Sequence, residues 1–339
     1  LGELEADDPQ VYAALQRADT IGLFQVESRA QQASLPRMKP KNFYDLVVQV
    51  AIIRPGPIQG KMAHPYLARR QGKEKPEPLH ECLREILDRT LGVPLFQEQL
   101  LRVAMAVADF TGGEAEELRR AFGFKRSEKR MRAIEVRLRE GMTKKGIVGE
   151  QQDKITKAIT SFAMYGFPES HAASFAVLAY ASAYLRTHYL PEFTCALLNN
   201  QPMGFYHPST VIKDAQRHGL RVLPVDINRS GMLCTLEDFE LRLGFNYVRG
   251  LNGAIAQSIV EHRPFASIHD LTLRVPELHK GALEKLSAAG ALNSIGAEHR
   301  RDALWQSARA SRPAGELLRE IPESSTGAPL RRMSVEERL

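Results

Sequence analysis

The feature that most limits the fold of this chain is a long alanine-rich segment. From Ser174 to Asn200 the chain reads SFAVLAYASAYLRTHYLPEFTCALLNN, with a proline only at Pro191. Alanine is the best helix former, and its small side chain lets a neighbouring helix approach closely. The sequence therefore predicts a long, tightly packed helix that is interrupted near Pro191. The alanines expected to allow this packing are Ala172, Ala173, Ala176, Ala179, Ala181 and Ala183.

The preceding residues also have apolar side chains at helical spacing. Arg54-Pro55-Gly56-Pro57 ends one of these runs, because proline lacks the N–H group and biases the residue before it away from helix. Gly112-Gly113 is expected to end another. A mainly α fold class follows. The expected helices are 8–17, one capped by Ser28, 42–53, 79–92, 95–111 and one beginning near Ser127.

The character of the sequence changes after residue 218. Residues 219–248 contain two short strand-like runs with a turn between them. Two helical hairpins are then expected around the turns Gly250-Leu251-Asn252 and Gly290-Ala291-Leu292. Such turns expose N–H groups at a helix N-terminus, where a DNA phosphate can bind without base readout. Asn252 stands where a second glycine is usual, and asparagine tolerates the left-handed conformation.

Composition excludes several classes of protein. The chain has 339 residues, 43% of them apolar, which is enough for two or three domains. No apolar run is long enough to span a membrane, and the acidic start is neither a signal nor a transit peptide. A start without Met predicts that the chain is part of a longer one. The lone cysteines Cys82, Cys195 and Cys234 favour a reducing cytoplasm over a disulfide framework or a zinc site.

Positive charge is concentrated in one segment. The net charge is +6, yet residues 119–145 contain eleven Lys or Arg and three Glu. Local basic density of this kind is typical of a surface that binds a polyanion, although a solvated helix face remains the alternative. Within the expected helix, Met131, Ile134, Leu138 and Met142 form one apolar stripe. The arginines expected on another face, toward DNA, are Arg126, Arg130 and Arg137.

Catalytic motifs are missing from the sequence. It contains no HExxH, GxSxG, GxxxxGK[ST] or GxGxxG pattern of the required context. Nucleotidyl transfer needs convergent carboxylates that hold two magnesium ions. Asp7-Asp8 lies at the N-terminus and Asp226 stands alone, so no metal site is expected in this chain. The chain has many Lys and Arg residues that could bind phosphate, but no cluster of carboxylates that could hold the metal ions.

Five ordered motifs identify a family. They are GLFQVESRA, AIIRPGPIQGKM, LFQEQLLRVA, GGEAEELRRAFGFKRS and YGFPESHAASFAVLAY. Together they resemble the fingers region of bacterial DNA polymerase III alpha subunits, the C-family polymerases, over about Thr20 to Ser294. The stretch FPESHAASFA, together with the one from Ala196 to Asn228, is most similar to the error-prone, damage-inducible branch. The run AFGFKRS differs from many error-prone members, so the replicative branch stays open.

The resemblance implies a domain order. Residues 1–203 would form the helical polymerase fingers, 204–240 a small α+β connector, 241–305 the tandem helix-hairpin-helix region and 306–339 a flexible linker. The palm aspartates and their Mg2+ ions would lie outside this chain, as would contacts to a sliding clamp and mutasome partners. The isolated chain is therefore expected to be inactive. The intact protein would be a cytoplasmic nucleotidyltransferase for translesion synthesis.

The resemblance also implies a basic and aromatic wall that closes over the incoming dNTP. Its expected residues are Arg54, Arg119, Arg120, Lys125, Tyr165, Phe167, Ser170 and His171. Purely structural interpretations remain. In these, Ser170 is an N-cap, His171 is a core residue and Arg54 forms a structural ion pair. Gln97-Glu98-Gln99 is interpreted as a hydrogen-bonding framework. The alternative function is a stand-alone helix-hairpin-helix module that binds DNA without catalysis.

Overall fold

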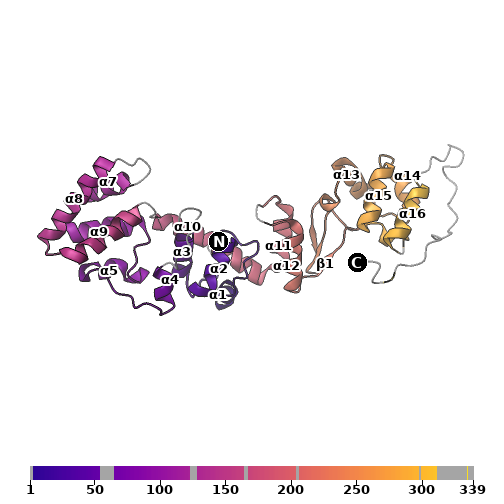
Figure 1. The fold of residues 1–339 in the computed structure, drawn as a ribbon. Helices are drawn as coiled ribbons and strands as arrows, with labels where there is room; N and C mark the ends of the chain where they lie inside the picture. The colour runs from indigo at the N-terminus through magenta and orange to yellow at the C-terminus, as the bar shows by residue number, and fades with distance from the viewer. Residues whose placement is uncertain are drawn as a thin grey trace. The chain divides into compact units, whose positions relative to one another are not determined.

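The chain folds into two compact units, Leu1–His188 and Tyr189–Leu339, both mostly helical (Figure 1). The computed structural model describes residues 3–53, 65–122, 128–163, 167–203, 206–297, 299–310 and 334, with backbone only at 122, 128–130 and 160–163. The mainly α fold class predicted from the sequence is confirmed. None of the described helices combines the length and apolar content needed to cross a membrane.

The first unit begins with helices that have side-chain caps, of which that by Ser28 was predicted from the sequence. Ser28 accepts a hydrogen bond from the Gln31 amide at 3.3 Å, and Asn42 accepts one from the Asp45 amide at 3.0 Å. Such caps satisfy amides that have no intrahelical partner. The helices of this unit are α1 (Pro9–Gln16), α2 (Arg29–Met38), α3 (Phe43–Ile52), α4 (Pro65–Arg70), α5 (Arg84–Leu87), α6 (Gln97–Ala108), α7 (Gly112–Phe122), α8 (Glu128–Lys144), α9 (Gly149–Ala163) and α10 (Glu169–His188).

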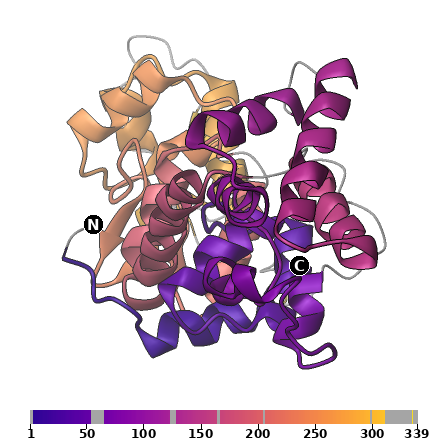
Figure 2. The same cartoon turned by 90° about the vertical axis from the view of Figure 1, so that its left-hand side faces the viewer.

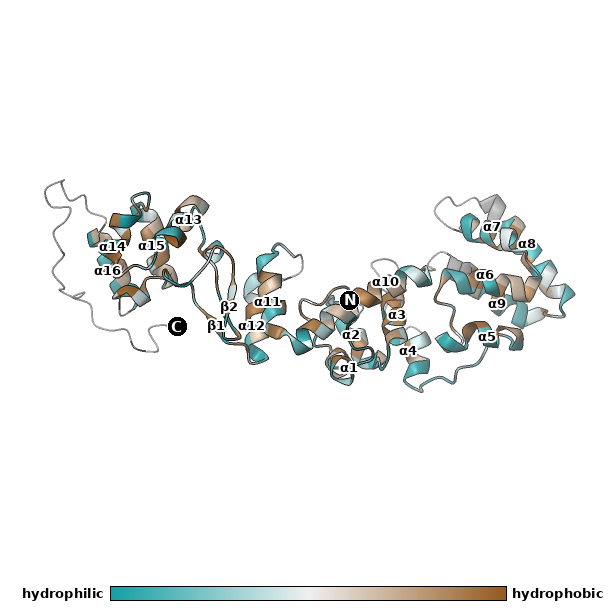
Figure 3. Ribbon diagram, turned by 180° about the vertical axis from the view of Figure 1, so that it is seen from behind, coloured by the Kyte–Doolittle hydropathy of each residue, from teal (hydrophilic) through white to brown (hydrophobic). Residues whose placement is uncertain are grey.

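The alanine-rich helix α10 packs along α3, which is apolar along its length (Figure 3). Ala172, Ala176 and Ala179 of α10 are fully buried, so the predicted packing of its small side chains is confirmed. The predicted interruption is also confirmed. α10 ends at His188, and α11 (Leu190–Asn199) begins with Pro191 in its first turn, where proline has no amide to leave unpaired.

Helices α7, α8 and α9 pack around α6 and share one apolar core (magenta in Figure 2). The predicted stripe on α8 is confirmed, since Ile134, Leu138 and Met142 are buried there. Gly141 lies against α6 so closely that a Cβ atom would stand 2.5 Å from the Ala108 carbonyl oxygen. Glycine at this position therefore lets the two helix backbones meet.

Gly112 and Gly113 begin α7 and do not end α6, so that expectation is wrong. α6 ends instead at Asp109, which takes the left-handed conformation with φ of 53°. Thr111 and Glu114 then bond to each other's backbone amides, which stabilises the start of α7. This reciprocal pair is a capping box, which the spacing T-x-x-E in the sequence indicates.

The segment 79–92, expected as one helix, is divided into three short turns. These are η2 (Glu81–Leu83), α5 and η3 (Asp88–Thr90), where η marks a 3-10 helix. Leu83 and Leu87 are both fully buried, so the apolar spacing is satisfied without a continuous helix. Leu91 and Gly92 end the segment with φ of 53° and 74°.

The second unit combines helices with one small sheet. Its strands are ordered β1-β3-β2, with β1 parallel and β2 antiparallel to β3. The two predicted strand runs are confirmed as β1 and β3, whereas β2 was not expected. The elements after α11 are α12 (Pro208–Arg217), β1 (Val222–Leu223), β2 (Thr235–Glu237), β3 (Glu240–Arg242), η4 (Phe245–Tyr247), α13 (Gly253–His262), α14 (Ile268–Arg274), α15 (Lys280–Ala289), η5 (Asn293–Ile295) and α16 (Arg300–Ala310).

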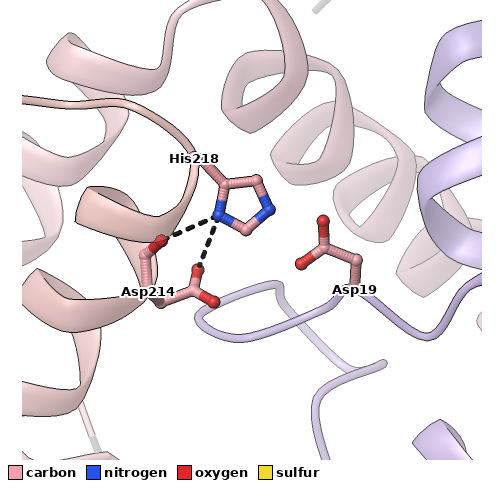
Figure 4. Close-up of side chains that lie close together, drawn as sticks. All are labelled: Asp19, Asp214 and His218. Atoms are coloured by element: carbon pink, nitrogen blue, oxygen red, sulfur yellow. Dashed lines mark hydrogen bonds and ion pairs between the residues drawn. The ribbon is translucent and has the colours of Figure 1, made fainter.

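The C-terminal end of α12 is closed by a histidine. The Nδ1 atom of His218 donates a hydrogen bond to the Asp214 carbonyl oxygen at 2.8 Å and lies 3.8 Å from the Asp214 carboxylate (Figure 4). The last carbonyl groups of a helix have no intrahelical donor, and a nearby histidine can supply one. The His218–Asp214 pair therefore has a structural role within α12.

Helices α13 to α16 surround a core of their own, built from side chains such as Ile259, Leu271 and Leu286. The expected helical region after residue 248 is confirmed. α16 continues to Ala310 and so enters the segment that the sequence predicts as linker.

Candidate functional site

The starts of α6 and α10 are joined, although 71 residues separate them in sequence. The Gln97 amide donates to the Phe167 carbonyl oxygen at 3.0 Å, and Phe96 pairs with Phe167 as an isolated bridge. The Glu98 carboxylate accepts a hydrogen bond from the Glu169 amide at 3.0 Å. Backbone amides in the first turn of a helix attract anions. One such amide of α10 is therefore already hydrogen-bonded to a carboxylate of this chain.

Aromatic rings form a row along the first turns of α10. The ring centroids of Phe167 and His171 are 5.0 Å apart, and those of His171 and Phe175 are 4.5 Å apart. Phe24 stacks on Phe175 at 5.5 Å and is itself 40% exposed. These spacings are those of favourable aromatic pairs, so the row presents a preformed apolar surface.

The purely structural interpretations of Ser170 as an N-cap and of His171 as a core residue are wrong. Ser170 lies inside α10, after Glu169, and is therefore not its N-cap. His171 is exposed rather than in the core. Both side chains are exposed on the first turn of α10, where the resemblance to polymerase fingers predicts nucleotide contacts.

Two arginines on α7 share one carboxylate. Arg119 donates to Glu116 through Nε at 2.8 Å and through Nη2 at 2.6 Å, while Arg120 donates through Nε at 3.1 Å. These bonds, that of Arg119 first, lower the pKa of the Glu116 carboxyl to about 2. The side chains of Arg119 and Arg120 are 36% and 75% exposed. The cluster therefore presents two guanidinium groups against a single negative charge.

Glu98 links this cluster to the start of α10. Hydrogen bonding to Glu116 raises the pKa of the Arg119 guanidinium, and the nearby Glu98 carboxylate adds to that rise. Glu98 also accepts a hydrogen bond from the Glu169 amide, so it interacts with residues of two separate motifs. We call Glu98, Glu116, Arg119, Arg120 and the first turn of α10 the α7–α10 site.

Sequence reasoning did not identify Glu116 or Arg89. Glu116 stands three and four residues before the two arginines, a spacing that places such side chains together on a helix and could have been read from the sequence. Arg89 lies 3.7 Å from the Glu169 carboxylate and 4.2 Å from the centre of the Tyr44 ring. No local sequence pattern predicts the contacts of Arg89 with Glu169 and Tyr44.

The framework interpretation of Gln97-Glu98-Gln99 is confirmed for Gln99. Its buried side-chain oxygen accepts hydrogen bonds from the Leu95 and Phe96 amides at 2.8 and 3.1 Å. Its nitrogen donates to the Thr90 hydroxyl at 2.8 Å. Gln99 therefore holds the loop that carries Phe96 in place at the start of α6.

The other predicted residues of the fingers are only partly described. Arg137 forms an ion pair with Glu114 of α7 and lies 5.6 Å from the centre of the Phe110 ring. It is thus already paired within the fold. Arg130 belongs to α8, but its side chain lies outside the described residues. The predicted residues that lie wholly outside them are Arg54, Lys125, Arg126 and Tyr165.

The first hairpin turn leads into α13 and leaves backbone amides at the start of that helix. Gly250 has φ of 78°, and the Asn252 side chain accepts a hydrogen bond from the Ala254 amide at 2.8 Å. The amides of Asn252 and Gly253 have no bonded acceptor in the part of the chain that the structure describes. Asn252 itself is extended, with φ of −72°, so the expectation of a left-handed Asn252 is wrong. Gly250 has that role, and Asn252 is the N-cap of α13.

The second turn has a different geometry. Gly290 ends α15 with φ of 78°, and its amide donates to the Ser287 carbonyl oxygen at 3.0 Å. The Ala291 amide donates to the Leu286 carbonyl oxygen at 2.9 Å, and both Ala291 and Leu292 are fully buried. The expectation that this turn begins a helix with exposed amides is therefore wrong. The bonds are those of a helix C-cap, which consume the amides that a phosphate would need.

Comparison with known families agrees with this division of the molecule. Residues 1–146 match the finger domain of the bacterial DNA polymerase III alpha subunit, and residues 219–303 match a helix-hairpin-helix motif. The first match contains the α7 arginines, and the second contains both hairpin turns.

Curated relatives extend the match over nearly the whole chain. The error-prone DNA polymerase of Anaeromyxobacter sp. (strain K) is 49% identical over 346 residues, which cover 97% of this chain and 30% of the relative. Those of Corynebacterium efficiens and Methylococcus capsulatus are 52% and 46% identical and cover 90% and 98% of this chain. The chain spans 28% to 34% of the length of these three relatives. It therefore belongs to the family of bacterial DNA polymerase III alpha subunits, of which it carries the finger domain and the helix-hairpin-helix region.

Proposed function

We propose that this chain is the part of an error-prone DNA-directed DNA polymerase that binds the triphosphate of the incoming dNTP and the primer-template duplex. The observation that carries the proposal is the pair of guanidinium groups of Arg119 and Arg120, held together by Glu116 on α7. Guanidinium groups suit bidentate contacts to phosphate oxygens.

An incoming triphosphate can compete for these arginines. Exposed ion pairs contribute only about 0–1 kcal/mol to stability, because water screens them. A triphosphate carries several negative charges where Glu116 carries one. Arg119 and Arg120 can therefore exchange Glu116 for phosphate at a small cost in free energy. Before the nucleotide binds, Glu116 keeps the two guanidinium groups close together.

The first turn of α10 supports the same assignment. The row of Phe167, His171 and Phe175 offers aromatic faces and edges against which a nucleobase could pack. Since Glu98 occupies the Glu169 amide, phosphate contacts at this end of α10 are assigned to side chains such as Ser170 and His171. Lys125, Arg54 and Tyr165 belong to the same proposed wall.

Duplex binding is assigned to the turn at Gly250, with Arg126, Arg130 and Arg137 as further contacts to the backbone. Unbonded amides at the start of a helix attract a phosphate without reading its base. Only the first of the two predicted turns offers them. We therefore propose a single amide-phosphate contact in this region.

Catalysis is assigned to parts of the polymerase outside this chain. Two-metal chemistry needs carboxylates that are available as ligands. In the α7–α10 site, Glu98 is bonded to a backbone amide and Glu116 to two guanidinium groups, so they do not fit a magnesium site. The complete polymerase would hold Mg2+ at a palm site and carry out translesion synthesis in the cytoplasm. Its proposed partners are a sliding clamp and mutasome proteins.

Photo-crosslinking tests the nucleotide assignment. A dNTP with a photoreactive group on its γ-phosphate is bound to the complete polymerase with primer-template, illuminated, and the labelled peptides are mapped by mass spectrometry. Label is expected in peptides that contain Arg119 or His171. Arg119→Gln should lower the yield, and excess unlabelled dNTP should abolish it. Label found only outside the finger domain would contradict the assignment.

Primer extension tests the assignment of catalysis. The 339-residue chain, purified and supplied with Mg2+, dNTPs and primer-template, is expected to incorporate no nucleotide. The complete polymerase serves as the positive control under the same conditions. Magnesium-dependent incorporation that co-purifies with the isolated chain would show that a catalytic centre lies within it.

A further inference from the structure

A basic pocket lies in the first unit, among residues that no assignment above uses. Its volume is about 570 Å³, within the range of small-molecule sites. It is formed by the end of α2, the loop before α3 and the end of α4. Four of its eight lining residues are Lys or Arg, and none is acidic. The lining residues are Pro36, Arg37, Met38, Lys39, Lys41, Asn42, Arg70 and Gln71.

Arg70 holds the wall of this pocket together. Its Nε atom donates to the Met38 carbonyl oxygen at 3.2 Å, and its Nη2 atom lies 2.5 Å from the Asp45 carboxylate. These bonds tie the end of α4 to the end of α2 and to the first turn of α3. Because Asp45 is buried and paired with Arg70, its charge is already balanced. Arg70 is therefore a structural member of the pocket.

The other three cations are not neutralised by the fold. Arg37, Lys39 and Lys41 are exposed, and none of them has an ion-pair partner among the described residues. The basic run of α7 and α8 is different, since Arg119 and Arg139 are both paired with carboxylates there. Three unpaired cations around one cavity create a local positive potential that attracts an anion.

Lys39 adds an independent observation. It ends α2 in the left-handed conformation, with φ of 47° and ψ of 64°. Glycine is favoured at this position of a helix end, and a long side chain there carries backbone strain. Strain of this kind is often retained where it places a functional group. Lys39 is one of the residues that line the pocket.

We propose that this pocket binds the phosphate group of a nucleotide, either free or as one unit of a DNA strand. Arg37, Lys39 and Lys41 would supply the charge. Asn42 would add a side-chain N–H donor, because its oxygen is already engaged by the Asp45 amide. The site does not depend on the α7–α10 site, with which it shares no residue.

Anion binding by the complete 339-residue chain tests this proposal. Isothermal titration calorimetry with pyrophosphate, dAMP and a short single-stranded oligothymidylate should show binding by at least one of them. Lys39→Gly and Lys41→Gln should each weaken it about three- to tenfold, the loss expected for an exposed charge-assisted contact. Lys39→Gly also relieves the left-handed strain, so circular dichroism should show an equal or higher melting temperature.

Two controls make the result specific. Lys213→Gln removes an exposed charge on α12 and should leave the affinity unchanged. Arg217→Gln, at the exposed end of the same helix, should also leave it unchanged. Binding of pyrophosphate or dAMP would indicate a free nucleotide as ligand, and binding of the oligonucleotide alone would indicate a strand. No binding, or equal loss in Lys41→Gln and Lys213→Gln, would overturn the proposal.

Discussion

Raising the salt concentration from about 50 to about 200 mM should weaken the binding of this chain to duplex DNA by about two to three decades. Each phosphate that the protein neutralises releases a counterion, so the affinity falls steeply with salt. Two duplexes of unrelated sequence should bind equally, because amide-to-phosphate contacts carry no base readout. Fluorescence anisotropy with both duplexes over a salt series measures both expectations.

Gly250→Val should lower this affinity. Gly250 has a positive φ that opposes a β-branched side chain, and a Cβ atom there would stand 2.8 Å from the Lys285 Nζ atom. The matched control is Gly219→Val, which has φ of 92° but open space around its Cβ position. The control introduces comparable backbone strain away from the turn and should bind DNA as the original chain does.

Asn252→Gly should affect the stability of α13 more than the binding of DNA. The Asn252 side chain caps α13, so its loss should destabilise that helix slightly, by a few tenths of a kcal/mol. DNA affinity should stay nearly the same, since the phosphate contact is assigned to backbone amides. A clear preference for one duplex, or a folded Gly250→Val chain with unchanged affinity, would remove the turn as the DNA-binding element.

In the complete polymerase, Arg119→Ala and Arg120→Ala should each reduce nucleotide incorporation about 10- to 100-fold. Loss of a charge-assisted hydrogen bond costs about 1.5–3 kcal/mol. Arg119 is the less exposed of the two and makes two bonds to Glu116, so its replacement should have the larger effect. Lys125→Ala is expected to act in the same direction. Single-turnover kinetics over a range of dNTP concentrations measure these changes.

Arg139→Ala is the matched control for this series. Arg139 belongs to the same basic stretch, yet it is paired with Glu135 and Asp153 on the α8–α9 side. Its removal should leave the kinetics unchanged. Unchanged kinetics in the Arg119 and Arg120 variants as well would show that these side chains are only part of a solvated helix face.

Much of the local structure could be read from the sequence, because the responsible interactions join neighbouring residues. The Ser28 cap, the apolar stripe on α8 and the break before Pro191 depend on hydrogen bonds and spacings within a few residues. The basic stretch 119–145 and the aromatic start of α10 were also found as candidate contact regions. The pairing of Glu116 with Arg119 and Arg120 was missed, although its spacing is visible in the chain.

Features that depend on distant contacts could not be read in this way. Glu98 reaches the start of α10 across 71 residues, and the basic pocket combines residues near position 40 with Arg70 and Gln71. The two hairpin turns look alike in sequence, but packing exposes the amides of one and buries the other. Periodicity and capping act along the chain, whereas burial and long-range pairing arise when separate segments share a core. The local elements therefore follow from the sequence, and the composition of each site follows from the packing.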